Sequence, residues 1–205
     1  MTDRVALVTA DDETLEAELA PAAAPRAQVV LCHPHPQFGG DMRSLVISEL
    51  FRALPDLGIT TLRFNFRGVG HSTGAYDGGD AERHDVRAAV AWLHDHDASR
   101  PLFLVGWSFG ADLALSDTEP ALAGWVAIAL PMRFGHDLGV VGADPRPKLV
   151  LLAANDEYRD ASEVEAVAAG WRATTTEVIA GASHFFVGRT ARLVEATSTW
   201  ITDQV

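Results

Sequence analysis

Ser108 lies at the centre of the stretch Gly106-Trp107-Ser108-Phe109-Gly110, between two segments of contrasting composition. The preceding residues 102–106 are mostly apolar and predict a strand buried on both faces. The small residues of 111–115 predict a helix. A serine in such a tight strand-to-helix turn has a strained backbone, and the flanking glycines leave room for the chain to fold back. The hydroxyl is then exposed near the free N–H groups of the helix N-terminus, which predicts a nucleophile rather than a chance match to a short motif.

Asp156 and His184 are the residues expected to activate Ser108. Asp156 follows an expected strand at 148–153, and His184 follows the last expected strand, at 174–179. Residues beyond the carboxyl ends of parallel strands meet at one edge of a sheet. A histidine takes the serine proton near neutral pH, and a carboxylate fixes its tautomer and stabilises the resulting cation. The chain order serine, acid, histidine therefore predicts a catalytic triad.

Other residues compete for the two supporting roles. Asp156 also suits a helix cap or a surface charge, and Asp137 and Asp144 are then the alternative acids. His184 also suits a buried structural role, and His136 is the other histidine late in the chain. We favour Asp156 and His184 because both follow expected strand ends.

The oxyanion hole is predicted from residues that have a backbone N–H to donate. The residue after the nucleophile, Phe109, supplies one donor. The loop after the expected strand at 28–32 supplies the second, but Pro34 and Pro36 have no N–H. His35 is therefore the nearest donor in that loop, with Gln37 as the alternative.

The pair His33 and His35 also has the appearance of a metal site. The remaining histidines do not stand at zinc-ligand spacing from this pair, and the single cysteine, Cys32, belongs to no thiolate set. We therefore expect neither a metal nor another cofactor, and an inert Cys32 buried in its strand.

Aromatic and soft side chains cluster around the same expected strand ends. Phe109 and Phe186 belong to this cluster, some members of which must lie in the core. Those that face outward would form an apolar pocket for an acyl or alcohol group. Two segments, 73–81 and 133–147, are the candidates for a partial lid. The residues predicted to bind substrate are Phe38, Trp107, Met132, Phe134, Tyr158 and Phe185.

Composition bounds the class of protein. A chain of 205 residues with 48% hydrophobic residues predicts one globular domain, 1–205. The net charge of −12 argues against nucleic acid and anionic membranes as partners, and mildly against highly anionic substrates. A single cysteine and the lack of a signal-peptide pattern favour a cytoplasmic location. A homodimer is compatible with the sequence, which does not determine the oligomeric state.

Apolar strands alternate with amphipathic helices along the chain, which predicts an α/β fold with a mostly parallel sheet of about eight strands and helices on both faces. No segment is long enough for a large cap domain. The turn-rich stretch 131–147 is expected to be a loop. Strands are expected at 4–9, 14–19, 28–32, 59–66, 102–106, 124–130, 148–153 and 174–179, and helices at 43–54, 81–94, 111–115, 161–171 and 190–201.

With these elements in this order, the chain resembles the α/β-hydrolase superfamily, and most of all its small bacterial members without a cap, related to dienelactone hydrolases. The resemblance covers the chain from about Val29 to the last helix. It implies that Ser108, Asp156 and His184 are nucleophile, acid and base, and that His35 and Phe109 stand at the oxyanion positions. The segments that carry it are His33-Pro-His, Asn65-Phe-Arg-Gly-Val-Gly-His-Ser, Gly106-Trp-Ser-Phe-Gly-Ala, Ala153-Ala-Asn-Asp-Glu and Gly181-Ala-Ser-His-Phe-Phe.

The sequence departs from the family pattern at three positions. Pro34 stands where a glycine often follows the histidine, and it stiffens the oxyanion loop. Asn65 stands where an aspartate is common, and Ala153 where a glycine often precedes the acid. None of these changes affects the triad.

The function expected from the residues is that of a serine hydrolase that cleaves a small-molecule ester or thioester through an acyl-enzyme. Two alternatives use the same site. One is acyl transfer or amide hydrolysis by the same triad, and the other is a ligand-binding protein that has kept the fold and lost turnover.

Overall fold

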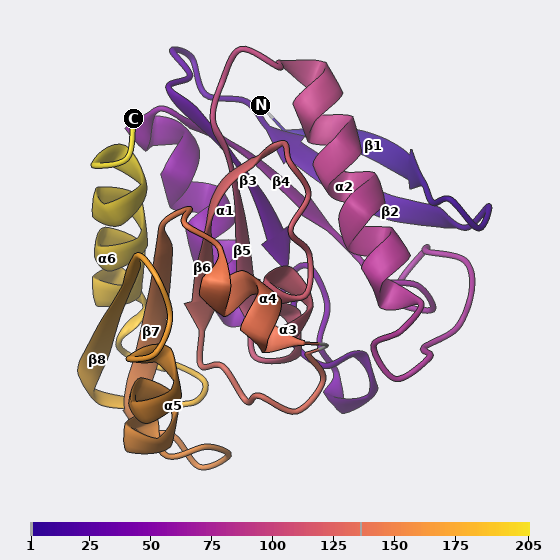
Figure 1. Cartoon of the computed structure of the whole chain (residues 1–205). Coiled ribbons are helices and arrows are strands. Elements are labelled where there is room, and N and C mark those ends of the chain that lie inside the picture. Colours follow the sequence, from indigo (N-terminus) through magenta and orange to yellow (C-terminus); the bar gives the residue numbers. More distant parts are fainter. Residues whose placement is uncertain (1, 136) are drawn as a thin grey trace.

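One sheet of eight strands runs through the protein, with strand order β1-β2-β4-β3-β5-β6-β7-β8 (Figure 1). The computed structural model describes residues 2–135 and 137–205. The strands from β3 to β8 pair in parallel, including β3 with β4, whereas β1 pairs with β2 and β2 with β4 antiparallel. The strands are β1 (Asp3–Val8), β2 (Thr14–Ala20), β3 (Ala27–Cys32), β4 (Ile59–Phe64), β5 (Leu102–Trp107), β6 (Leu122–Ile128), β7 (Lys148–Asn155) and β8 (Thr174–Ser183). This architecture confirms the predicted fold class.

Helices cover both faces of the sheet, as Figure 1 shows. On one face, α1 and α6 pack against apolar residues of β3, β5, β6 and β7. On the other face, α2, α3 and α5 pack against a second apolar cluster. Every residue of β3 and β5 is buried, which explains their almost unbroken apolar sequences. The helices are α1 (Leu45–Ala53), α2 (Glu82–His96), α3 (Phe109–Leu115), α4 (Leu138–Ala143), α5 (Ala161–Ala168) and α6 (Thr190–Thr202).

Several boundaries differ from those expected. Helix α1 ends at Ala53, one residue earlier, and a short 3₁₀ helix, Leu54–Leu57, follows, because Pro55 cannot continue an α-helix. Strand β6 ends at Ile128 because Ala129 has a positive φ of 47°. Strand β8 extends to Ser183 through a register shift against β7, so His184 follows the strand immediately.

The stretch 131–147 is not all loop, as the turn-rich composition predicted. It contains the short helix α4, which buries Val141 and Gly142. Gly142 packs so closely against the Trp171 ring that an added Cβ would lie 2.5 Å from it. The helix therefore depends on a contact with a distant part of the chain. No helix within 2–135 and 137–205 has the length and apolarity needed to cross a membrane.

Candidate active site

Ser108 stands in the turn between β5 and α3 with φ 55° and ψ −122°. This backbone conformation is rare for a residue with a side chain and is maintained by close packing around it. A Cβ on Gly106 would lie 2.0 Å from the carbonyl oxygen of Gly110, and a Cβ on Gly110 would lie 2.2 Å from that of Cys32. The two glycines therefore let α3 start directly against the ends of β5 and β3, with the predicted strand–turn–helix geometry.

The structure brings Ser108, His184 and Asp156 into one line of hydrogen bonds. The Ser108 hydroxyl donates to Nε2 of His184 at 2.9 Å, and Nδ1 of His184 donates to the Asp156 carboxylate at 2.8 Å to Oδ2 and 3.0 Å to Oδ1. Asp156 lies just after β7, and His184 just after β8. Both side chains are about 5% exposed. The three expected strand ends thus meet at one edge of the sheet.

The surroundings of Asp156 keep its carboxylate ionised. Burial raises its pKa, but hydrogen bonds from His184 and from the backbone N–H groups of Tyr158 and Arg159 outweigh burial and lower the pKa below its usual value. The backbone N–H of His184 donates a hydrogen bond to Oε2 of Glu157 at 3.0 Å. An ionised carboxylate on Nδ1 stabilises an imidazolium when the ring takes up the serine proton.

The alternative acids lie elsewhere. The Asp144 carboxylate accepts a hydrogen bond from Arg146, and the backbone carbonyl oxygen of Asp144 accepts one from Lys148. Asp137 precedes α4 in a left-handed conformation. Neither contacts His184. The competing histidine, His136, lies outside the described residues.

The loop after β3 arranges the predicted oxyanion donors. The N–H of Gln37, the alternative second donor, donates to Nδ1 of His35 at 3.2 Å and is therefore engaged within the loop. Nε2 of His35 then carries the ring proton and donates to the hydroxyl of Tyr76 at 3.0 Å. The ring of Phe109 is fully buried, so it does not reach the cavity. Burial and the charge of Arg133 lower the pKa of His35.

His33 is a structural histidine rather than half of a metal pair. Its ring is fully buried; Nε2 accepts the backbone N–H of Phe66 at 3.0 Å, and Nδ1 donates to the carbonyl of Pro34 at 2.6 Å. Burial lowers its pKa to about 4, so the ring is neutral at physiological pH. Both nitrogens are thus used inside the protein. Cys32 is buried as expected, and burial raises the pKa of its thiol.

A cavity of about 560 Å³ opens over Ser108 and His184. Phe38, Trp107, Phe134, Tyr158 and Phe185 line it, as predicted. Met132 does not: its side chain packs against the core instead. Phe186, like Phe109, is a core residue. Gly39 and Gly40, whose lack of a side chain was expected to let the loop after β3 approach a substrate, also line it. The other lining residues, which the sequence did not indicate, are Pro34, Ser44, Leu45, Pro131, Arg133 and Val187.

Two buried carboxylates, unexpected from the sequence, fix segments beside this cavity. Asp112 on α3 accepts the N–H groups of Met132, Arg133 and Phe134 at 3.1, 2.8 and 2.7 Å. Glu82 on α2 accepts those of Asp77 and Gly79, both at 2.8 Å. Both acids have no exposed surface. Parts of both lid candidates, 73–81 and 133–147, are therefore anchored to helices of the core.

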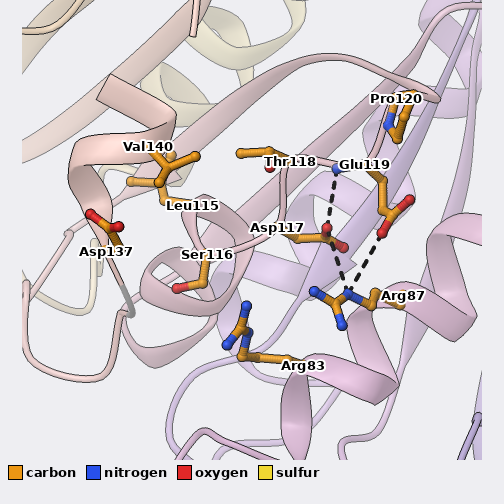
Figure 2. Close-up of a pocket in the computed structure, with 10 residues that line it drawn as sticks. All are labelled: Arg83, Arg87, Leu115, Ser116, Asp117, Thr118, Glu119, Pro120, Asp137 and Val140. Carbon is orange, nitrogen blue, oxygen red and sulfur yellow. Dashed lines mark hydrogen bonds and ion pairs between the residues drawn. The ribbon is translucent and has the colours of Figure 1, made fainter. Parts of the chain in front are cut away.

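A second, smaller cavity of about 340 Å³ lies at the opposite end of α3 from Ser108 (Figure 2). Arg87 faces two of its acidic residues: Nε of Arg87 lies 4.0 Å from Asp117 and 3.7 Å from Glu119. Among the described residues predicted as acids or bases, the alternative acid Asp137 lines it. We therefore assign the chemistry to the cavity over Ser108.

The fold and this site define an α/β hydrolase, and comparison with known proteins agrees. The chain belongs to the α/β-hydrolase superfamily: the family model described as serine aminopeptidase, S33 matches residues 23–135. An α/β serine hydrolase homologue from Coxiella burnetii is 32% identical, with a TM-score of 0.86 and 96% of each chain covered. An α/β serine hydrolase without a lid from Xanthomonas campestris is 29% identical, with a TM-score of 0.89, and the alignment covers 100% of this chain and 95% of that one.

A curated relative extends this similarity. The uncharacterized protein RP471 of Rickettsia prowazekii (strain Madrid E) is 32% identical over 199 residues, covering 91% of this chain and 84% of the relative. Together, these relationships make the protein a member of the serine-hydrolase fold family and support hydrolase activity.

Proposed function

We propose that the protein is a serine hydrolase that cleaves small carboxylic esters or thioesters through a covalent acyl-enzyme. The observation that carries this proposal is the line of hydrogen bonds from Ser108 through His184 to Asp156. A serine hydroxyl is a weak nucleophile by itself and reacts when a neighbouring base removes its proton. His184 accepts from that hydroxyl at 2.9 Å, within the range for proton transfer.

The reaction follows from these positions. Ser108 Oγ attacks the substrate carbonyl while Nε2 of His184 takes its proton, and the imidazolium is stabilised by ionised Asp156. The oxygen of the tetrahedral intermediate accepts hydrogen bonds from the N–H groups of Phe109 and His35. His184 then protonates the leaving alcohol or thiol. In the second half, water gives a proton to His184 and attacks the acyl carbon. The bond between that carbon and Ser108 Oγ then breaks, His184 returns the proton to Oγ, and the acid is released.

The cavity favours esters and thioesters over an aminopeptidase reaction. An aminopeptidase has to hold the ammonium group of its substrate, and a carboxylate is the side chain suited to that task. Among the described residues that line the cavity, there is no aspartate or glutamate, and the charged residue is Arg133. Its walls include the aromatic rings of Phe38, Trp107 and Phe185. These walls suit an uncharged acyl or alkyl group next to the reacting carbonyl.

A chain-length series of p-nitrophenyl esters, run beside acyl thioesters with Ser108→Ala as the blank, tests this function. We expect turnover by the native protein and a loss of at least about 10³-fold in kcat for Ser108→Ala. Turnover that survives in Ser108→Ala would contradict the proposal, as would folded protein that hydrolyses none of the substrates. Product analysis with an added alcohol distinguishes hydrolysis from acyl transfer.

A further inference from the structure

Arg133 places a cation in the wall of the active-site cavity. The protein has 28 acidic and 16 basic residues, yet the described lining of this cavity contains Arg133 and no carboxylate. Within the described ranges, its guanidinium has no ion-pair partner, and its contact is the ring of Phe134, 5.5 Å from the centroid. Many arginines elsewhere, such as Arg67 and Arg146, are bonded to carboxylates. The position is therefore locally positive in an acidic protein.

The backbone at Arg133 is held in place from inside the protein. Asp112, which lies on the helix that begins directly after Ser108, accepts the Arg133 N–H at 2.8 Å and also holds the neighbouring residue Phe134. Because Ser108 is the N-cap of the helix that carries Asp112, the backbone at Arg133 is fixed relative to the nucleophile. The positive charge of Arg133 also acts within the site, since it contributes, after burial, to the lowered pKa of His35.

We propose that Arg133 selects substrates that carry a carboxylate remote from the scissile ester or thioester bond. This inference rests on the proposed function and narrows its substrate class. Guanidinium groups bind carboxylates in bidentate geometry, and the apolar walls beside Arg133 strengthen that attraction relative to bulk water. The overall net charge of −12 repels anions from most of the surface, so recognition of such a substrate depends on this local cation.

Pairs of esters that differ in one charge test the proposal. The first pair carries the charge on the acyl side: the mono-p-nitrophenyl esters of adipic or pimelic acid, whose carboxylates do not reach their own ester through a small ring, against the matching ω-carboxamides. The second pair carries it on the leaving group: 4-acetoxybenzoate against 4-acetoxybenzamide. In the native protein, we expect kcat/KM to favour the carboxylate by about fivefold or more in at least one pair.

Arg133→Glu should reverse this preference, and Arg133→Gln should abolish it. Arg172→Glu, which changes the net charge equally at an exposed site outside the cavity, should retain the native ratio. Added salt should reduce the native preference, because it screens an exposed charge. The ratio within each pair is the readout, so a general loss of activity in a variant does not affect it.

Two results overturn the proposal: equal kcat/KM for both members of both pairs in the native protein, or an unchanged preference in Arg133→Glu. Either result leaves the proposed function intact if neutral esters are still cleaved and Ser108 still reacts with a fluorophosphonate. Loss of all ester cleavage and of labelling in the native protein would instead contradict the proposed function itself.

Discussion

The backbone N–H of Phe66 donates to Nε2 of His33 at 3.0 Å and joins the loop after β3 to the segment after β4. Nδ1 of the same ring donates to Pro34, the residue before the predicted oxyanion donor His35. A neutral imidazole thus fixes the loop from both sides. A protonated ring has no acceptor for the Phe66 N–H, so protonation of His33 and this arrangement exclude each other.

This arrangement makes stability depend on pH. Burial lowers the pKa of His33 to about 4 in the folded protein, against an ordinary value of 6.5. The unfolded chain therefore binds a proton that the folded one does not, and the contribution of His33 to stability is lost as the pH falls from about 6.5 to about 4, by up to about 3 kcal/mol. The variant His33→Gln lacks this titrating group. The difference in the free energy of unfolding between the native protein and the variant should therefore decrease as the pH falls.

Urea unfolding of the native protein and His33→Gln at neutral pH and near pH 4.5 measures the effect. The exposed His71, replaced by glutamine, is the matched control for removal of a histidine. The same difference between native and His33→Gln at both pH values would contradict the assignment of a buried neutral ring.

Asp112→Asn should loosen the wall of the cavity. The carboxylate accepts the backbone N–H groups of Met132, Arg133 and Phe134, whereas an asparagine has one oxygen and directs an NH₂ group at the remaining donors. We expect a loss of about 2–3 kcal/mol in stability and an increase in KM. Thermal unfolding and steady-state kinetics check both. Asp160→Asn, at the exposed N-cap of α5, should cost little, because asparagine caps as well as aspartate, and equal effects of the two substitutions would be evidence against this role.

Tyr76→Phe removes the hydroxyl that accepts from Nε2 of His35. Because this bond holds the ring of the residue whose N–H is assigned to the oxyanion, the substitution should lower kcat several-fold and change KM little. Its cost in stability should be no more than about 1 kcal/mol. Ester kinetics with the native protein and the variant separate the two parameters. An increase in KM with an unchanged kcat would place Tyr76 in substrate binding instead.

Asp156→Asn should lower kcat by about 10⁴-fold while the protein remains folded, because an amide does not stabilise the imidazolium on His184 and favours the wrong tautomer. Asp144→Asn is the control, since Asp144 is paired with Arg146 and does not contact His184. Circular dichroism verifies folding, and ester kinetics give the rates. A comparable loss in Asp144→Asn would indicate that the acid has been assigned wrongly.

The fold class could be predicted from the sequence because buried parallel strands have few polar residues and the glycines around Ser108 indicate a tight turn. It placed Ser108, Asp156 and His184 at the correct edge, since each follows a strand end. It did not reveal the anchoring role of Asp112, because a single acid in a short helix gives no sign of the distant N–H groups that it accepts. Met132 and Arg133 are adjacent, and only the loop geometry determines which of them lines the cavity.

Covalent labelling of Ser108 tests the central claim most directly. The native protein, Ser108→Ala and His184→Ala are treated with a fluorophosphonate, and the adduct is located by mass spectrometry of the intact protein and its peptides. We expect one adduct, on Ser108, in the native protein, none in Ser108→Ala and a strongly slowed reaction in His184→Ala. Folded native protein that stays unlabelled, or that is labelled equally fast without His184, would contradict this claim.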